Sequence, residues 1–255
     1  MHDWKDRTRL LLKDRLTILE NAHILVVGLG GVGSYAAEML CRAGVGKLTL
    51  IDADVVDCTN RNRQLPALLS TEGKLKTEVM QERLLDINPE VKLVILSEFI
   101  KGERIAEVLD LDKYDYVVDA IDSLSPKVFL IAETLKRKIP LVSAMGAGGK
   151  IDPLKVQVAD ISKTHQCHLA SYMRKRLRKM GIVSGFKAVF SIEEQMKNIG
   201  REDTFSEFKR TTIGTISYMP VIFGCWCAAV CVEDLVRSPT VINDITFQTN
   251  GYFIR

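Results

Sequence analysis

Short apolar runs alternate with amphipathic stretches through the first half of the chain. Residues 23–27 are mostly apolar and end at Gly28, and residues 34–43 then carry apolar side chains at helical spacing. Residues 48–51 return to the apolar character of a strand before Asp52. This order predicts a β–α–β unit whose first strand is buried and parallel to its neighbours.

The same alternation continues down the chain. Further strands are predicted over residues 92–96, 116–121 and 141–144, and helices over residues 75–87 and 126–136. Strands that are separated by helices of this length favour a parallel sheet. We therefore expect an α/β fold with a Rossmann-like, doubly wound and mostly parallel sheet and a C-terminal helical and strand extension.

The second half of the chain is less regular. A basic helix is predicted over residues 168–180, a long loop over residues 191–210, and weak strand-like alternation in the tail, residues 237–255. Residues 211–232 carry no charge and are numerous enough to cross a membrane, but glycine, serine and proline interrupt them. Packing inside the domain or a dimer is therefore favoured over membrane insertion.

Composition narrows the class of protein. The chain has 255 residues, 47% hydrophobic and 26% charged, so it can bury a large core, and disordered, collagen-like and small disulfide-rich classes are excluded. The six cysteines are widely spread and no basic-then-apolar leader begins the chain, which predicts a reducing cytoplasm. The net charge of +3 is too small to indicate a nucleic-acid partner by itself.

A glycine-rich turn follows the first predicted strand. Gly28, Gly30, Gly31 and Gly33 stand between that strand and the next helix, where glycine lets the backbone approach a phosphate and the helix N-terminus attracts it. Asp52 ends the following strand, where a carboxylate can accept hydrogen bonds from ribose hydroxyls. The pattern predicts a nucleotide site, and up to this point an NAD-dependent dehydrogenase also fits.

Charged residues farther along the chain distinguish between NAD and a nucleoside triphosphate. Arg63 and Lys76 supply cations for the β- and γ-phosphates, and Asp122 supplies a carboxylate for Mg²⁺ at the end of a later strand. A dinucleotide enzyme has little use for this combination. The chain also lacks the Gly-Lys-Ser/Thr of a P-loop, since Ile151 follows Lys150. The sequence therefore predicts ATP and Mg²⁺, bound without a P-loop.

These segments, in this order, resemble a known family. The adenylating domain of ubiquitin-activating-like enzymes (the ThiF-, MoeB- and HesA-type proteins) is similar over about residues 5–165, in the segments Gly28 to Gly33, Asp52-x-Asp54, Asn60-x-x-Arg63-Gln64, Lys76 and Asp119-x-x-Asp122. The resemblance implies that a substrate carboxylate attacks the α-phosphate of ATP. An acyl-adenylate and pyrophosphate would then form.

The resemblance also implies a role for each matching residue. Asp52 would bind the ribose, Asn60, Arg63 and Lys76 would line the phosphates, and Asp122 would bind magnesium. Asp54 and the four glycines complete the ATP-binding set. Family members are homodimers in which an arginine near one N-terminus enters the site of the other subunit, so the resemblance implies a catalytic set of Arg7 (with Arg9 as the alternative), Arg63, Lys76 and Asp122.

The cysteine pattern indicates a branch of the family. Activators of sulfur-carrier proteins usually carry two Cys-x-x-Cys pairs that bind zinc, and no such pair exists in this sequence. The resemblance is strongest to the tRNA threonylcarbamoyladenosine dehydratases, extends to about residue 236, and lies in Asn60 to Gln64, Ala120 to Ser123, Gly146 to Lys150, Asp152-Pro153 and Val156 to Val158. This branch implies a ligase-like, ATP-dependent cyclisation (dehydration) of N6-threonylcarbamoyladenosine in tRNA, with release of AMP and pyrophosphate.

On this interpretation the chain divides into three segments. Residues 1–165 form the ATP-binding adenylating core, residues 166–236 complete the same domain, and residues 237–255 are a tail. The run 174–179 has five cations in six residues and predicts a local surface for tRNA phosphates, with a merely solvated helix face as the alternative.

Several readings stay open at this point. The core also suits adenylation of the C-terminus of a ubiquitin-like or sulfur-carrier protein, or a nucleotide-sensing or sulfur-relay module without turnover. A partner from a cysteine desulfurase or sulfur-acceptor system is likewise open.

Cys225, Cys227 and Cys231 are expected to pack as small hydrophobes in an apolar helix rather than to react. His165 and His168 flank Cys167 but lack a carboxylate partner for a metal site.

Overall fold

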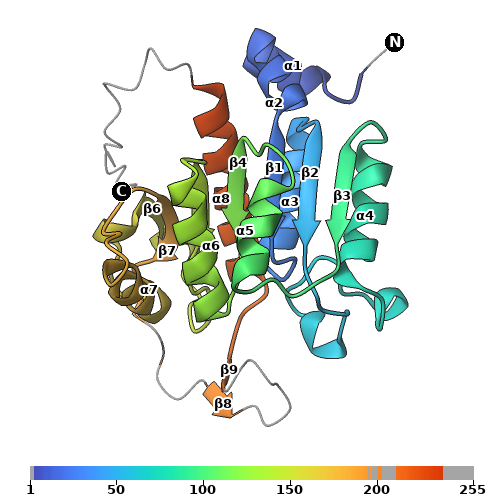
Figure 1. Ribbon diagram of the computed structural model, residues 1–255. Coiled ribbons are helices and arrows are strands. Elements are labelled where there is room, and N and C mark those ends of the chain that lie inside the picture. The colour runs from blue at the N-terminus through green and yellow to red at the C-terminus, as the bar shows by residue number, and fades with distance from the viewer. Residues whose placement is uncertain (1–2, 195, 197–199, 203–210, 238–255) are drawn as a thin grey trace, which may run out of the picture.

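The computed structural model describes residues 3–194, 196, 200–202 and 211–237. A seven-stranded sheet forms its centre, in the order β3-β2-β1-β4-β5-β7-β6 (Figure 1). All neighbouring strands are parallel except β6, which is antiparallel to β7. The strands are β1 (His23–Val27), β2 (Lys47–Ile51), β3 (Lys92–Leu96), β4 (Tyr116–Asp119), β5 (Leu141–Ala144), β6 (Val156–Asp160) and β7 (Lys187–Ser191). The predicted α/β fold with a mostly parallel sheet is confirmed.

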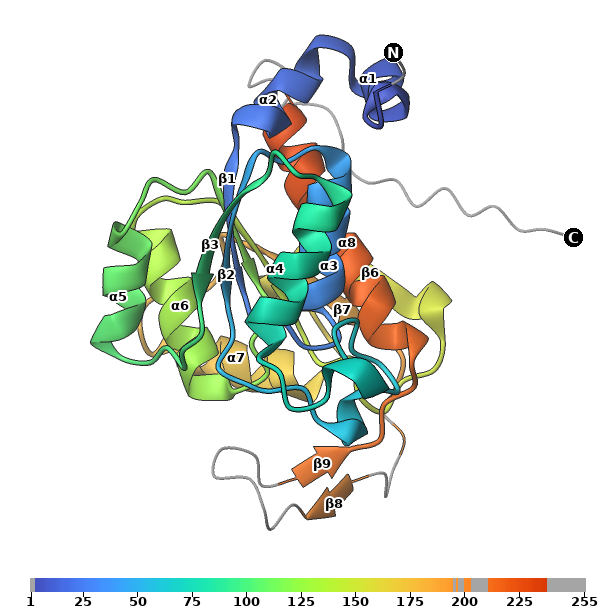
Figure 2. The ribbon, with the colours of Figure 1, turned by 90° about the vertical axis from the view of Figure 1, so that its right-hand side faces the viewer.

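Helices cover both faces of the sheet. In Figure 2, α3, α4 and α8 lie on one side of the strands and α5 and α6 on the other. Side chains of α7 join the same apolar cluster as those of α5 and α6. The helices are α1 (Asp6–Leu12), α2 (Leu16–Asn21), α3 (Gly33–Ala43), α4 (Lys76–Ile87), α5 (Glu103–Asp110), α6 (Leu124–Lys136), α7 (His168–Arg178) and α8 (Tyr218–Val236).

Alternating side chains of the central strand enter two separate cores. Ile24 and Val26 pack into the cluster beneath α3 and α8, whereas Leu25 and Val27 pack into the cluster beneath α5 and α6. A strand that is buried on both faces must be apolar at successive positions. This requirement explains why β1 is a continuous apolar run in the sequence.

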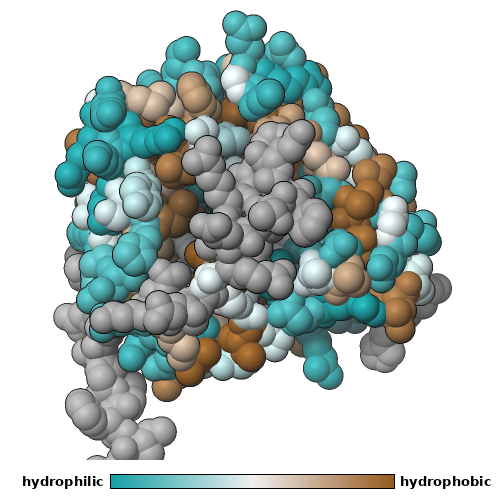
Figure 3. All heavy atoms as spheres, turned by 90° about the horizontal axis from the view of Figure 1, so that it is seen from below, coloured by the Kyte–Doolittle hydropathy of each residue, from teal (hydrophilic) through white to brown (hydrophobic). Residues whose placement is uncertain are grey.

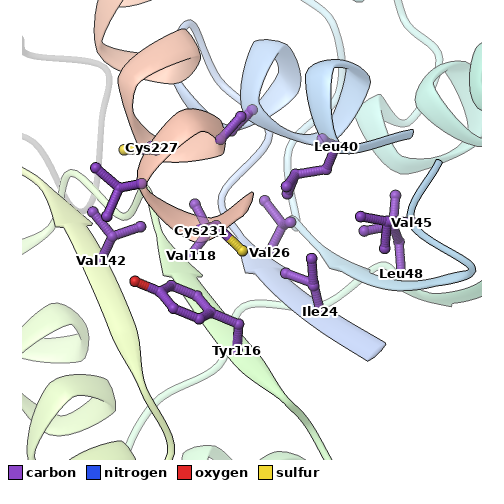
Figure 4. Packing of buried hydrophobic residues seen from close by; sticks show 14 of the residues in the cluster. Ile24, Val26, Leu40, Val45, Leu48, Tyr116, Val118, Val142, Cys227 and Cys231 are labelled. Carbon is purple, nitrogen blue, oxygen red and sulfur yellow. The ribbon is translucent and has the colours of Figure 1, made fainter. Parts of the chain in front are cut away.

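Helix α8 belongs to the core of the molecule. Phe223, Cys227 and Cys231 are fully buried, and Figure 4 shows Cys231 beside Tyr116 and Val118 of β4. Among the described residues, α8 alone is long and apolar enough to cross a membrane, and half of its apolar window is buried inside the molecule. The buried side of α8 packs within the domain, as expected for this part of the uncharged stretch.

Parts of the prediction need correction. The expected loop over residues 191–210 contains the strand β8 (Gly200–Glu202), which pairs with β9 (Thr211–Ile213) in a separate two-stranded sheet. The strand expected to reach residue 121 ends at Asp119, because the chain turns there. The predicted tail, residues 237–255, lies outside the described residues beyond Arg237.

The register of the sheet brings three loops to one edge. Val27 at the end of β1 is the partner of Ile51 in β2 and of Asp119 in β4. Gly28 N donates to Ile51 O at 2.8 Å and Ala120 N donates to Val27 O at 2.9 Å, so the pairing continues into the loops. We call this the carboxyl edge; Figure 3 views the molecule from its side and shows hydrophilic side chains with smaller hydrophobic patches around the rim.

Candidate active site

The glycine-rich turn lies against the loop that follows β4. Gly28 has φ +91°, and a Cβ there would lie 2.8 Å from Ala120 O. A Cβ on Gly33 would lie 1.7 Å from Gly28 O, which no side chain can tolerate. Gly30 and Gly31 lie between them, and Gly33 begins α3. The turn thus gives backbone N–H groups and the positive end of a helix, the combination that binds a phosphate.

Asp52 is tied directly to this turn. Its Oδ2 accepts a hydrogen bond from Leu29 N at 2.6 Å, and its Oδ1 accepts one from Asp54 N at 2.8 Å. Burial raises the pKa of the Asp52 carboxyl, against the opposing charge of Lys76 and the two backbone donors. A carboxylate has about four lone-pair sites, so two remain for ribose hydroxyls.

Lys76 is held by a neighbouring carboxylate. Its Nζ lies 2.6 Å from Asp54 Oδ2, and the Lys76 side chain is 4% exposed while Asp54 is 70% exposed. Lys76 is the first residue of α4, and its backbone N donates to Asp54 O at 3.0 Å. Both residues of the predicted ATP-binding set are therefore brought together, with Asp54 orienting the ammonium group.

Arg63 lies beside the glycine turn. A Cβ on Gly31 would lie 3.2 Å from Arg63 O and 3.4 Å from its Cγ. The guanidinium donates to Thr59 O at 2.9 Å and to Asn62 Oδ1 at 2.8 Å, both neutral oxygens. Burial lowers the pKa of Arg63, and the charge of Asp122 opposes that shift. The predicted cation and the predicted magnesium ligand therefore lie close enough to interact electrostatically.

Asn60 serves the local fold as well as the predicted site. It ends the 3-10 turn Cys58–Asn60, and its Oδ1 accepts a hydrogen bond from Asp57 N at 3.2 Å to close a capping box. Since the carboxamide oxygen is used in this way, the amide group Nδ2 is the part that can donate to a phosphate.

Asp119 and Asp122 have different surroundings although one motif contains both. Asp119 is fully buried and accepts from Ser143 Oγ at 2.6 Å and from Lys127 Nζ at 2.8 Å. Asp122 is exposed at the N-terminus of α6 and accepts from Ser123 Oγ at 3.4 Å. Asp119 thus supports the loop, and Asp122 is the carboxylate that a cation in solution can reach.

Two residues of the site were missed in the sequence analysis. Lys127 reaches Ile121 O as well as Asp119, and the signal is a lysine at the start of an otherwise apolar helix stretch. Gln64 was quoted as part of a motif without a role. Its buried Oε1 has no hydrogen-bond partner among the described residues, and its Nε2 would lie 3.8 Å from a Cβ on Gly30. A buried polar atom without a partner beside a phosphate-type loop fits a site shaped for a ligand.

Arg7 lies away from these residues within one chain. It is exposed on α1, and α1 and α2 precede the first residue of β1, so they lie at the edge of the sheet opposite Gly28 (Figure 1). Arg9 is engaged with Asp3 and Asp6, at 2.6 Å from each. Neither predicted arginine therefore lies at the site of its own chain.

The cysteines and histidines show no metal site among the described residues. Burial raises the pKa of the Cys227 thiol to about 12, and it raises the pKa of Cys231 well above its usual range. The His165 ring packs edge-on to Phe190, with centroids 5.7 Å apart. Cys227 and Cys231 pack as expected. Cys225 is exposed on α8, so the prediction of packing is wrong for that cysteine.

Comparison with known proteins supports the same interpretation. The model of the ThiF family matches residues 6–253. The chain is 40% identical over 244 residues to a tRNA threonylcarbamoyladenosine dehydratase of Bacillus subtilis (strain 168), covering 93% of this chain and 96% of the relative. The crystal structure of the E. coli tRNA N6-threonylcarbamoyladenosine dehydratase, TcdA, in complex with ATP is similar, with a TM-score of 0.81, 38% identity, and coverage of 91% of this chain and 94% of that one.

A relative with a different substrate is less similar. The sulfur carrier protein ThiS adenylyltransferase of Escherichia coli (strain K12) is 33% identical over 158 residues, covering 58% of this chain and 61% of the relative.

Proposed function

Because the chain belongs to the ThiF family, we propose that it uses ATP to activate a carboxylate, and that this carboxylate is the threonyl group of N6-threonylcarbamoyladenosine in tRNA. The observation that carries the proposal is the convergence of Arg63, the Asp54–Lys76 pair and Asp122 around the glycine turn at the carboxyl edge. The similarity to dehydratases over nearly their whole length selects the substrate.

Each residue of the site binds a different part of ATP. The N–H groups at the start of α3 donate hydrogen bonds to phosphate oxygens, and Asp52 accepts hydrogen bonds from ribose hydroxyls. Arg63 and Lys76 compensate the charge of the phosphates, and Asn60 donates from Nδ2. Placing these groups before the reaction starts lowers the cost of developing charge in the transition state.

Asp122 suits the Mg²⁺ that accompanies ATP. Magnesium in such sites takes one or two carboxylates together with phosphate oxygens and water, so a single exposed aspartate is a sufficient protein ligand. When bound, the ion would neutralise charge on the departing pyrophosphate. The nearby Arg63 guanidinium supplies positive charge from the protein itself.

Two consecutive displacements give the product. A carboxylate oxygen of the threonyl group attacks the α-phosphorus and pyrophosphate leaves. The neighbouring carbamoyl group then attacks the activated carbonyl, loses a proton, and expels AMP. The nucleoside loses the elements of one water molecule and ATP becomes AMP and pyrophosphate. Both reacting groups belong to one nucleoside, so their proximity replaces a protein nucleophile, which agrees with the burial of Cys227 and Cys231 in α8.

A homodimer would complete the site. Helix α1 contains no buried residue, and its Leu10 and Leu11 are 80% and 77% exposed. We propose that this helix packs on a second copy and carries Arg7 to the phosphates of that copy. The proposal keeps residues 1–165 as the adenylating core, residues 166–236 as its completion and residues 237–255 as a tail, in a cytoplasmic enzyme.

Mass spectrometry of tRNA nucleosides tests the function. Purified protein is incubated with ATP, Mg²⁺ and tRNA that carries N6-threonylcarbamoyladenosine, and we expect the modified nucleoside to lose one water mass while AMP appears. Omission of ATP is the control and should leave the nucleoside unchanged. Formation of AMP only with a sulfur-carrier protein, and none with modified tRNA, would favour the alternative of protein C-terminus adenylation.

A further inference from the structure

A basic cavity lies beside the adenylation site. It has a volume of about 310 Å³ and is lined by Leu124, Tyr172, Lys175, Arg176 and Lys179. Pockets that hold small ligands start at about 300 Å³. Four of the five lining residues come from α7 and its C-terminal cap, and the fifth from the first turn of α6. The cavity is thus built between two helices whose packing is part of the core.

The cavity is close to the proposed chemistry in the chain and in space. Leu124 follows Asp122 by two residues, and Arg176 donates from its guanidinium to Ser125 Oγ at 2.9 Å. Figure 1 shows α7 beside the lower end of α6, at the carboxyl edge of the sheet. A substrate that extends from Asp122 along the N-terminus of α6 therefore meets the cavity next.

One face of α7 gathers the groups that RNA requires. Tyr172, Lys175, Arg176 and Lys179 are spaced by three, four and seven residues, which places them on one side of a helix. All four are exposed, with Tyr172 at 59%. The opposite side of the helix is buried through Ala170, Met173 and Leu177. An exposed aromatic ring among cations can stack a base while the cations hold the flanking phosphates.

These cations differ from the arginines of neighbouring helices. Arg104 lies 2.7 Å from Glu98, and Arg137 lies 2.7 Å from Asp110. No ion pair to Lys175, Arg176 or Lys179 is present in the part of the chain that the structure describes. Three adjacent cations that lack acidic partners repel one another. A bound polyanion removes the unfavourable electrostatic energy of that repulsion.

We propose that this cavity is a tRNA subsite for the nucleotide next to the modified adenosine, with the base stacked on Tyr172 and the phosphates on either side of it held by Lys175, Arg176 and Lys179. The assignment rests on the proposed function, because it takes the modified adenosine to be the group at Asp122. It also gives a direction to the bound RNA, which would run from the adenylation site over the N-terminus of α6 onto α7.

Two sets of variants test the subsite by filter binding of tRNA that carries N6-threonylcarbamoyladenosine. Tyr172→Ala should weaken binding about 5- to 150-fold, whereas Tyr172→Phe should retain the wild-type affinity, since stacking needs only the ring. The double variant Lys175→Gln/Lys179→Gln should lower the slope of log affinity against log salt by about 2, one for each phosphate contact.

A matched pair of lysine and arginine positions controls for net charge. Lys163 and Arg178 are exposed and do not line the cavity, so Lys163→Gln/Arg178→Gln removes two charges as well. We expect a smaller change of slope in this double variant. Equal changes in both double variants would overturn the subsite and indicate a diffuse charge effect.

Measurement of ATP affinity shows whether the phosphate bound in the cavity belongs to tRNA or to ATP. If the cavity serves tRNA, the dissociation constant of ATP stays the same in all four variants. A loss of ATP affinity with unchanged tRNA affinity would overturn the assignment, because the cavity would then hold a phosphate of ATP.

The mass-spectrometric assay of the wild-type enzyme separates the proposed function from the proposed subsite. Absence of water loss from the nucleoside contradicts the function, whereas water loss together with unaffected Tyr172→Ala binding contradicts only the subsite.

Discussion

Lys127 Nζ lies 2.8 Å from Asp119 Oδ2, and both side chains are fully buried. The same ammonium donates to Ile121 O at 2.9 Å, and Asp119 Oδ1 accepts from Ile121 N at 3.1 Å. The pair therefore holds the backbone of Ile121 from both sides. This arrangement fixes the turn that presents Asp122 to the site.

Replacing Lys127 should destabilise the protein strongly. Lys127→Met leaves the Asp119 carboxylate buried without a charged partner, so the free energy of unfolding should fall by about 3–5 kcal/mol. Urea unfolding measures the loss. Lys136→Met on the same helix, where the side chain is 75% exposed, is the matched control and should change the stability by no more than about 0.5 kcal/mol. Equal stability of the two variants would contradict the role of the buried pair.

Arg63 should be needed for the chemistry rather than for the fold. Arg63→Ala removes a fixed positive charge beside the glycine turn, so ATP–pyrophosphate exchange in the presence of modified tRNA should slow by about 10²–10³-fold. The neighbouring Arg61 is exposed, and its side chain donates to Cys58 O at 3.3 Å. Arg61→Ala should therefore retain the exchange rate, and an active Arg63→Ala enzyme would remove Arg63 from the site.

A mixture of two inactive variants tests the contribution of Arg7 from a second subunit. Arg7→Ala and Asp122→Ala should each be inactive alone. When the two are co-expressed, half of the dimers combine one of each chain and contain one intact site, so about one quarter of the wild-type activity should return. Sedimentation confirms that dimers form. No recovery in mixed dimers would show that Arg7 does not enter the site of the second subunit.

Asp52 should give ATP binding an unusual dependence on pH. Burial raises its pKa, so it takes up a proton at a higher pH than the usual value of about 4 for aspartate. Protonation places a hydrogen on one carboxyl oxygen and removes the negative charge, so Asp52 then accepts hydrogen bonds from Leu29 N and the ribose hydroxyls less strongly. Affinity for ATP should thus fall on acidification while the ordinary aspartates remain charged. The dissociation constant measured against pH for wild type and for Asp52→Asn isolates this effect from the titration of ATP, and identical profiles would contradict it.

The same shift has the opposite sign for stability. Because the pKa of Asp52 is higher in the folded than in the unfolded chain, the folded state favours the protonated form. The contribution of Asp52 to the free energy of unfolding is therefore greatest at low pH and decreases as pH rises through the folded-state pKa. Function at neutral pH uses the ionised form that folding disfavours.

Alkylation should separate the cysteines into two classes. Cys58 and Cys225 are exposed, whereas Cys41, Cys167, Cys227 and Cys231 are buried, and burial raises the pKa of Cys41 to about 11 and of Cys227 to about 12. Since the thiolate is the reactive form, maleimide at neutral pH should modify only the exposed class in the folded protein. Peptide mapping measures this. Rapid labelling of Cys227 would contradict its packing in the core.

The periodicity of the sequence was sufficient to predict the strands and helices at the centre of the fold. Strands β3 and β5 have the bounds expected, since a mainly apolar run of four or five residues is too short for a helix of ordinary length. Helices α1, α2 and α5 were not predicted. Helix α1 buries no side chain, so its sequence carries no apolar stripe that faces a core.

The site was predictable where its residues are close in sequence or belong to a motif. Asp52, Lys76 and Asp122 were identified from their spacing, but the link between Asp52 Oδ2 and Leu29 N requires the register of two strands. The Lys127–Asp119 pair depends on how α6 packs on β4. The cavity beside α7 depends on the contact of α7 with the start of α6, two helices far apart in the chain, which no local pattern records.

Helix α7 lies in the connection between β6 and β7, two neighbouring strands of the sheet. Its buried side maintains the domain, and its exposed side meets the solvent at four adjacent positions. These two sides can vary separately during evolution. If α7 holds the proposed subsite, exchange of its exposed side chains would change how a descendant of this chain binds RNA, while the folding of the core stays as it is.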